Sequence, residues 1–285
     1  MAMRMLKQII KDVTPPILIK GLRKVVPRAP AAPPVPPSEP APAKPVTMFS
    51  GDYQSFAEAA AHCEGYDAKG PAESAANQLR RLLEAPPPVE IDGRFQQVHS
   101  ALCIARDHLR KTSLSVLDIG GASGGYFFRM RALLPATQLR WHVVETPTLA
   151  AACTAVAGDV LTFGHGIPAD QAFDVALISG TLQYLPDPLA TLRQAAQHAG
   201  WIVLTRVPTH PERAQFMVQT VPAHIHQGSM PIHIFSQAEL TAAIAEVGTV
   251  ELSWAVTLDD PAFVGMDVTN VGYLIRSTRK TAAAG

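Results

Sequence analysis

Val116-Leu117-Asp118-Ile119-Gly120-Gly121-Ala122-Ser123-Gly124-Gly125-Tyr126-Phe127 is the stretch that decides the fold of this 285-residue chain. An apolar segment ends in an acid, and a glycine-rich turn then leads into a helical pattern. Glycine lets the backbone approach a ligand because no Cβ atom stands in the way. In open α/β sheets, ligands bind at the carboxyl ends of the strands. The stretch therefore predicts a strand, a ligand-binding loop and a helix in succession.

The spacing of the glycines and the position of the acid argue against a dinucleotide ligand. A dinucleotide-binding loop has glycines at its first, third and sixth positions, whereas Ala122 holds the third place from Gly120. Asp118 suits a cationic ligand better than a phosphate, and S-adenosylmethionine carries an ammonium and a sulfonium. Glu145 ends the next predicted strand, 21 residues beyond Gly124, where it can accept both ribose hydroxyls of a nucleoside. The alternative for Glu145 is an acid that stabilises a helix start.

Short apolar runs alternate with helical stretches after residue 112, which is typical of βαβ units in a parallel sheet. The last two predicted strands are joined by a segment too short for a crossover helix, so they should pair as an antiparallel hairpin. The seven predicted strands cover residues 115–119, 138–145, 160–163, 173–179, 201–206, 249–257 and 271–277. Helix starts are indicated at Thr146-Pro147, at Asp187-Pro188, and at two capping boxes, Ser55 with Glu58 and Ser236 with Glu239.

The N-terminal part changes composition along its length. Residues 1–28 carry seven Lys and Arg against one Asp, with apolar residues at helical spacing. This basic amphipathic tail is expected either to lie on an anionic lipid surface or to stay solvated. Two further helices are expected over 72–83 and 94–109. The predicted segments are a tail at 1–28, a Pro/Ala-rich extended linker at 29–47, a helical cover at 48–112 and a ligand-binding domain at 113–280.

Charge and cysteine content exclude several classes of protein. The chain has 24 Lys+Arg and 24 Asp+Glu, so the part beyond the basic tail is mildly acidic, which disfavours nucleic acid as a partner. No apolar run approaches the roughly 18 residues of a membrane span, and lysines interrupt the place where a signal peptide would be apolar. The three cysteines are far apart and show no CxxC spacing. We therefore expect reduced thiols in a cytoplasmic protein, with peripheral contact at the inner membrane through the tail.

A third segment completes a family pattern. The stretch 173–188, FDVALISGTLQYLPDP, places a small-residue turn at the carboxyl edge of the predicted sheet. Together with the glycine loop and Glu145, it makes residues 113–277 resemble the class I S-adenosylmethionine-dependent methyltransferases. The resemblance implies a Rossmann-like α/β sheet of seven strands in the order 3-2-1-4-5-7-6, with the last strand antiparallel. Three shorter segments look like those of a bacterial methyltransferase group associated with surface-polysaccharide biosynthesis: Phe49-Ser50-Gly51-Asp52-Tyr53, Ser55-Phe56 and Gly65-Tyr66-Asp67.

The resemblance also implies roles at a cofactor site for S-adenosylmethionine. The alternative for Phe163, one of the residues concerned, is a place in the apolar core. The implied roles put Asp118, Gly120, Gly121 and Gly124 around the methionine part, Glu145 on the ribose, Phe163 and Gly164 beside the adenine, and Ser179 and Gly180 beneath the sulfonium.

Methyl transfer to an alcohol requires an aligned nucleophile and benefits from a general base. The turn after the fourth predicted strand reads Ser179-Gly180-Thr181-Leu182, not the Asn/Asp-Pro-Pro-Tyr/Phe quartet of exocyclic-amine methyltransferases, so an O-methyl product is favoured. Histidine fits the role of base because its ordinary pKa near 6.5 lets it accept a proton at cellular pH. The candidates for this catalytic role are His210, His224, His226 and His233, together with Tyr184.

Two further residue types bear on the acceptor and on metals. Gln183 and Tyr184 are expected to bind acceptor hydroxyls, and Arg206 either holds an acidic sugar or phosphate or forms a structural ion pair. A zinc site built from His224, His226 and His233 is an alternative, but their spacing is not helical and no acid accompanies them. We expect no metal.

These patterns predict S-adenosylmethionine-dependent methyl transfer. The resemblance to the surface-polysaccharide group implies that the acceptor is a hydroxyl of a saccharide or saccharide-lipid precursor in bacterial surface-glycan biosynthesis. The small-molecule or glycan acceptor would lie between the N-terminal cover and the segment 208–235. Two alternatives stay open: a non-catalytic nucleotide-binding scaffold of the same fold, and an NAD-linked oxidoreductase.

Overall fold

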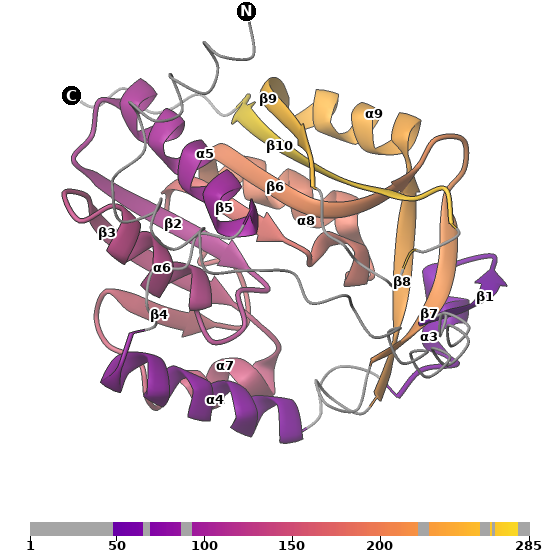
Figure 1. Cartoon of the computed structure of the whole chain (residues 1–285), viewed down its shortest axis with the longest axis horizontal. Coiled ribbons are helices and arrows are strands. Elements are labelled where there is room, and N and C mark those ends of the chain that lie inside the picture. Colours follow the sequence, from indigo (N-terminus) through magenta and orange to yellow (C-terminus); the bar gives the residue numbers. More distant parts are fainter. Residues whose placement is uncertain are drawn as a thin grey trace, which may run out of the picture. The chain divides into compact units, whose positions relative to one another are not determined.

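The computed structural model describes residues 48–64, 69–86, 93–221, 228–256, 263 and 266–278 (Figure 1). The predicted tail and linker at 1–47 lie outside the described residues. The helices are α3 (Phe56–Ala60), α4 (Lys69–Glu84), α5 (Gly93–Leu109), α6 (Gly125–Leu133), α7 (Pro147–Thr154), α8 (Pro188–His198) and α9 (Gln237–Val247), with a 3₁₀ turn, η2 (Leu182–Tyr184).

A seven-strand sheet of the predicted topology lies at the centre of the fold. Its order is β4-β3-β2-β5-β6-β10-β9, which is 3-2-1-4-5-7-6 when the seven predicted strands are numbered along the chain. Strands β2 to β6 pair in parallel, and β10 is antiparallel to both β6 and β9. The predictions of a Rossmann-like sheet and of a final hairpin are therefore confirmed. The strands are β2 (Ser113–Ile119), β3 (Gln138–Val144), β4 (Leu161–Gly164), β5 (Phe173–Ser179), β6 (Ala199–His210), β9 (Gly248–Ala255) and β10 (Thr269–Ser277).

Helices cover both faces of this sheet and create two apolar layers. Strands such as β2 and β5 are almost continuously buried, as expected when neither face meets solvent. In β2, Val116 packs into the layer formed with α4, α5, α6 and α7, whereas Leu117 packs into the layer formed with α8 and α9. Because consecutive side chains point to opposite faces, one apolar run supplies both layers. The carboxyl ends of the parallel strands stay at a single edge between them.

Three strands add a second, smaller sheet that the sequence pattern did not predict. They are β1 (Phe49–Tyr53), β7 (Gln215–Val221) and β8 (Gly228–Ser236), and they pair antiparallel in the order β1-β7-β8. β8 then joins the end of β6 through two residue pairs, Thr209 with Phe235 and His210 with Ser236. The region expected to be a purely helical cover thus begins with a strand. The segment expected to be an insertion is a hairpin attached to the main sheet.

Three of the four predicted helix starts have a side-chain cap, and the fourth, at Thr146, has none. Ser55 Oγ accepts a hydrogen bond from the Glu58 amide at 3.1 Å, and Ser236 Oγ accepts from the Glu239 amide at 3.1 Å. Asp187 caps α8 by accepting from the Ala190 amide at 3.0 Å. Proline stands in the first turn of α7 and of α8, where its missing N–H has no helical partner to lose. These local signals set where the helices leave the sheet edge.

Candidate active site

The glycine loop between β2 and α6 adopts the conformation that its glycines permit. Gly120 and Gly124 have φ angles of +73° and +76°, in the left-handed region that favours glycine. The Gly120 amide donates to the Val144 carbonyl at 2.8 Å, which ties the loop to the end of β3. A Cβ atom on Gly120 would collide with the Thr181 side chain from the turn after β5. The loop therefore connects the ends of three neighbouring strands.

Ala122, the residue that breaks the dinucleotide pattern, is also left-handed, with φ +50°. Its amide donates to Glu145 Oε1 at 2.9 Å. The Thr146 amide donates to the other carboxylate oxygen, Oε2, at 3.1 Å. Burial raises the pKa of Glu145, and these two amide hydrogen bonds oppose that rise. Each oxygen keeps lone-pair capacity for a further donor, so the geometry is compatible both with a ribose ligand and with the helix-start alternative.

Asp118 lies beneath the loop and not at its surface. Its side chain is 1% exposed and accepts a hydrogen bond from Trp141 Nε1 at 2.8 Å. Burial raises the pKa of Asp118 to about 7; the Trp141 hydrogen bond opposes this rise and the nearby Glu145 charge adds to it. A Cβ atom on Gly121 would collide with the carboxyl group. Asp118 can therefore act on a ligand above the loop through its charge.

The end of β4 carries the two residues predicted beside an adenine. Phe163 is 8% exposed and packs in the apolar layer with α7, as its core alternative requires. The Gly164 carbonyl accepts from the Glu145 amide at 2.9 Å, which places the end of β4 next to the ribose candidate. The nearness of Gly164 to Glu145 is thus observed, and contact of Phe163 with a base stays a prediction.

The end of β5 meets the helix that follows the glycine loop. The hydroxyls of Ser179 and Tyr126 share a hydrogen bond of 2.8 Å. Burial raises the pKa of Tyr126. Gly180 has φ +67°, and its amide donates to the Thr205 carbonyl at 2.9 Å. Tyr126 was not assigned a role from the sequence, although its place in the first turn after the loop was the available signal.

A small cleft lies beyond Gly180, on the β6 side of β5. It encloses about 30 Å³, close to the volume of one water molecule. The Tyr184 hydroxyl donates to Gln219 Oε1 at 2.6 Å across this cleft. Gln183 and Arg206, both predicted as acceptor-binding residues, also line it. The lining residues are Phe49, Gln183, Tyr184, Arg206, Gln219, Phe263 and Asn270.

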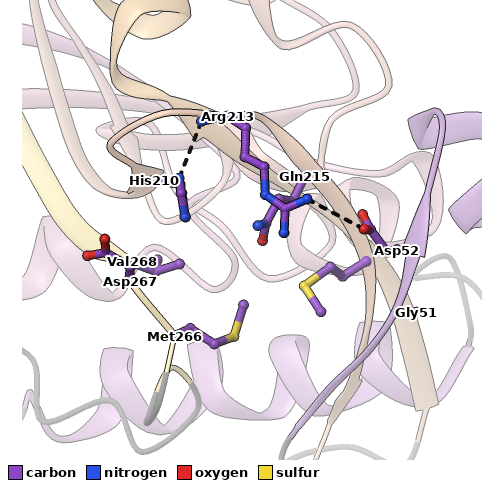
Figure 2. A pocket seen from close by; sticks show the side chains of 9 residues that line it. Gly51, Asp52, His210, Arg213, Gln215, Met266, Asp267 and Val268 are labelled. Carbon is purple, nitrogen blue, oxygen red and sulfur yellow. Dashed lines mark hydrogen bonds and ion pairs between the residues drawn. The ribbon is translucent and has the colours of Figure 1, made fainter.

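A larger cavity of about 300 Å³ lies next along β6 (Figure 2). His210 Nδ1 accepts hydrogen bonds from the amides of Glu212 at 3.1 Å and Arg213 at 3.3 Å. The proton of the neutral ring must then reside on Nε2. Through this atom His210 can donate a hydrogen bond but cannot accept a proton. Arg213 also lies 3.7 Å from Asp52 of β1, which closes one wall. The cavity is lined by Gly51, Asp52, His210, Arg213, Gln215, Met217, Met266, Asp267 and Val268.

Among the remaining histidine candidates, only His233 lies in the described part of the chain, and it does not line either cavity. His233 is 5% exposed and stacks between the rings of Phe216 and Phe235. Its Nε2 lies 3.4 Å from a Glu239 carboxylate oxygen, and burial lowers the pKa of His233. His224 and His226 lie outside the described residues. Among residues that the structure describes, no cluster of three or more His, Cys, Asp or Glu side chains could hold a metal ion.

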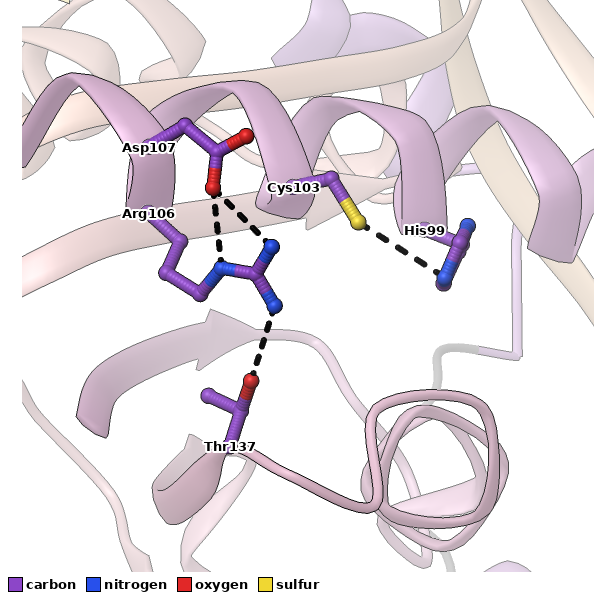
Figure 3. Close-up of polar contacts among 5 residues, drawn as sticks. All are labelled: His99, Cys103, Arg106, Asp107 and Thr137. Atoms are coloured by element: carbon purple, nitrogen blue, oxygen red, sulfur yellow. Dashed lines mark hydrogen bonds and ion pairs between the residues drawn. The ribbon is translucent and has the colours of Figure 1, made fainter. Parts of the chain in front are cut away.

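A group of polar side chains on α5 lies at the opposite edge of the sheet (Figure 3). Arg106 donates to Thr137 Oγ1 at 3.1 Å, just before β3 begins, and pairs with Asp107 at 2.9 Å. Cys103 Sγ lies 3.7 Å from His99 Nε2, and burial raises the pKa of this thiol. Of these contacts, only the Arg106–Thr137 hydrogen bond joins α5 to another segment, since the other two lie within the helix. None of these residues lines either cavity, so the group is separate from the candidate site.

No protein-family model and no curated protein matches the chain. Solved structures are similar to it at low identity. The N-terminal domain of EvdMO1 with SAH bound is 16% identical and covers 70% of this chain and 96% of its own, with a TM-score of 0.46. The 1,6-didemethyltoxoflavin-N1-methyltransferase of Burkholderia thailandensis is 17% identical, with coverages of 76% and 95% and a TM-score of 0.46. CalS10, an amino pentose methyltransferase from Micromonospora echinaspora, is 15% identical, with coverages of 72% and 96% and a TM-score of 0.41. At these identities, the residues of this chain must carry any assignment of function.

Proposed function

We propose that this protein transfers a methyl group from S-adenosylmethionine to a hydroxyl of a saccharide or saccharide-lipid acceptor. The observation that carries the proposal is the pairing of two carboxylates with one glycine loop. Glu145 holds the loop through the Ala122 amide, and Asp118 lies beneath Gly121 with its pKa raised to about 7. A cation bound above the loop would be stabilised by both charges, whereas a pyrophosphate would be repelled by them.

The chemistry is an in-line displacement, in which the acceptor oxygen bonds to the methyl carbon while the carbon–sulfur bond breaks. S-adenosylmethionine supplies the activated methyl group when bound. The chain's own residues hold the two reactants in line and exclude water. Glu145 would accept the ribose hydroxyls, and Ser179 and Gly180 would form the floor beneath the reacting methyl. The acceptor hydroxyl would pass its proton to a general base as the new bond forms, and S-adenosylhomocysteine would leave with the electron pair of the broken carbon–sulfur bond.

The acceptor would reach this floor from the cavity along β6. That cavity is lined by residues of β1 from the N-terminal cover, by residues 210–217 from the 208–235 segment, and by residues 266–268. The small cleft is lined by Arg206, whose guanidinium lies beside Gly180. His210 would donate a hydrogen bond to the acceptor from Nε2, because its Nδ1 is engaged by backbone amides. Tyr184 would position an acceptor hydroxyl from the small cleft. The general-base role stays a prediction for His224 and His226.

Glu145→Ala is expected to weaken S-adenosylmethionine binding tenfold or more, on the order of 1.4 kcal/mol. The substitution removes the predicted ribose acceptor and frees the Ala122 amide that holds the loop. Isothermal titration calorimetry measures the effect directly. Glu246→Ala is the matched control, since this acid is exposed on α9 and pairs with Arg193 at the surface.

Calorimetric titrations also separate the proposed methyltransferase from the two alternatives, an NAD-linked oxidoreductase and a non-catalytic scaffold. Tight binding of NAD in place of S-adenosylmethionine would favour an oxidoreductase. Cofactor binding without methyl transfer to any saccharide acceptor would favour a scaffold. If wild type and Glu145→Ala bind S-adenosylmethionine equally, the proposed site is wrong.

The basic tail at 1–28 is proposed to hold the protein at anionic lipid. None of the helices in the described part of the chain is long and apolar enough to cross a membrane. Full-length protein is expected to sediment with anionic vesicles, and a chain lacking residues 1–28 is expected to remain in the supernatant. Equal sedimentation of the two chains would remove the membrane proposal.

A further inference from the structure

Strand β6 changes its partner beside the candidate site, and Arg206 lies where the change occurs. β5 pairs with β6 as far as Ser179 with Thr205, and β8 begins to pair only at Thr209. Arg206 lies between these two pairings with φ +61°, a left-handed conformation for a residue with a side chain. Such a conformation costs roughly 1–2 kcal/mol. It coincides with a bulge in the pairing of β6 with β10, between the pairs Val271–Val207 and Tyr273–Leu204.

The guanidinium group lies close to Gly180. A Cβ atom at Gly180 would lie 3.0 Å from the Arg206 guanidinium, which is tighter than an ordinary contact. An alanine there would require the arginine side chain to shift by a few tenths of an ångström. The charge of Arg206 therefore lies directly beside the turn at which the methyl group would be transferred.

Two residues that line the small cleft each have a buried polar atom without a partner. Arg206 Nε is buried without a hydrogen-bond acceptor, and no ion pair to Arg206 is found among the described residues. Gln183 is 5% exposed, and its Oε1 is buried without a donor. Both side chains line the same cleft. A buried polar group without a partner costs about 1–3 kcal/mol, so a ligand that satisfied both atoms would bind with that advantage.

We infer that Arg206 and Gln183 form a subsite for a carboxylate or phosphate group carried by the acceptor, which would make the acceptor an acidic saccharide. The inference rests on the proposed methyl transfer. The planar guanidinium matches the oxygens of such a group, and Gln183 Oε1 accepts a hydrogen bond from a neighbouring hydroxyl. A cleft of about 30 Å³ admits the oxygen atoms of the group but not a sugar ring, so the ring remains outside in the adjoining space.

The position of the cleft assigns the anion to the acceptor and not to the cofactor. The carboxylate-bearing ends of β2 and β3 lie on one side of β5, and β6 lies on the other. The cleft is closed by residues from β1, β7 and β10, all on the β6 side, namely Phe49, Gln219 and Asn270. The S-adenosylmethionine carboxylate would instead lie near the glycine loop.

The test uses the full chain saturated with S-adenosylhomocysteine, with D-glucuronate, D-glucose 6-phosphate and D-glucose as probes in calorimetric titrations. At least one acidic sugar is expected to bind tenfold or more tightly than glucose. Arg206→Gln is expected to abolish this preference, and Arg206→Lys to retain part of it. Arg193→Gln, which removes a surface arginine on α8, should behave as wild type.

Arg206→Gly covers the case in which Arg206→Gln does not fold, because glycine accepts the left-handed backbone without strain. Absence of any preference for an acidic sugar in wild type, or its persistence in Arg206→Gly, would overturn the inference. Weaker binding of S-adenosylmethionine but unchanged binding of 5′-methylthioadenosine in the Arg206 variants would also overturn it, because Arg206 would then hold the cofactor carboxylate. Failure of wild type to bind S-adenosylmethionine would contradict the proposed function, whatever the probe sugars do.

Discussion

Gly120→Ala is expected to lower the free energy of unfolding by about 2–5 kcal/mol and to abolish measurable binding of S-adenosylmethionine. The left-handed backbone at Gly120 adds roughly 1–2 kcal/mol for any residue with a Cβ atom. The new Cβ also collides with the short Thr181 side chain, and overpacking of this kind costs about 1–3 kcal/mol. Relief of the collision would move the loop away from the end of β5, where the methyl group is proposed to react.

Gly125→Ala, at the other end of the glycine loop, is the matched control. Gly125 begins α6, and a Cβ atom there would have no heavy atom within 4 Å. Alanine favours a helix by about 0.5–1 kcal/mol over glycine, so this variant should be at least as stable as wild type. Urea unfolding and calorimetric titration measure both quantities. Wild-type affinity in Gly120→Ala would show that the loop conformation does not matter for the ligand.

Asp118→Asn is expected to stabilise the protein relative to wild type, by an amount that grows with pH to about 4 kcal/mol. The folded chain holds the Asp118 proton up to a pKa of about 7, whereas the unfolded chain releases it near the ordinary value of 3.8. Between these values the folded state binds more protons, so wild-type stability falls as pH rises from about 4 to 7. Asparagine never ionises and can still accept the Trp141 hydrogen bond through its amide oxygen.

Urea unfolding of the two proteins from pH 4 to pH 8 measures this difference, and groups common to both, such as His233, cancel in the comparison. The two curves should diverge across the window and run parallel above pH 7. Identical profiles would mean that Asp118 is not the buried acid described above.

The protonation of Asp118 also predicts how the affinity for the cofactor depends on pH. A bound cation favours ionised Asp118, so wild-type affinity should rise as pH increases toward 7 and then level off. Asp118→Asn should bind more weakly and lose this dependence. The buried acid would then be a group that lowers stability and strengthens binding.

Local sequence signals predicted most of the main sheet and the placement of the glycine loop and Glu145 at its carboxyl edge; their roles toward a cofactor stay predictions. The apolar runs, the glycine loop and the caps at Asp187 and Ser236 act within a few residues, and each has the expected geometry. Glu145 was found from its distance along the chain because parallel strands bring successive carboxyl ends to one edge. Its hydrogen bond to Ala122, a residue noted only for departing from the glycine pattern, was not predictable from spacing.

The acceptor side was not predicted in the same way. β1 contains Gly51 and Asp52, which are poor strand formers, and it is a strand only because β7 supplies partners for its backbone. The cavity brings Asp52 beside Arg213, far apart in the sequence, and no periodicity reports such a pairing. His233, predicted as a base, is instead enclosed by two phenylalanine rings.

The sequence by itself determined the parallel strands, the final hairpin, the glycine turn and the two acids at neighbouring strand ends, because these depend on short-range periodicity and spacing. The order of the strands was implied by the family resemblance. Only the tertiary structure decided that Asp118 is covered, that His210 presents a donor, and that Arg206 lies without an ion-pair partner among the described residues. The burial of Asp118, the tautomer of His210 and the pairing of Arg206 all depend on which segments, distant in the sequence, pack together in the fold.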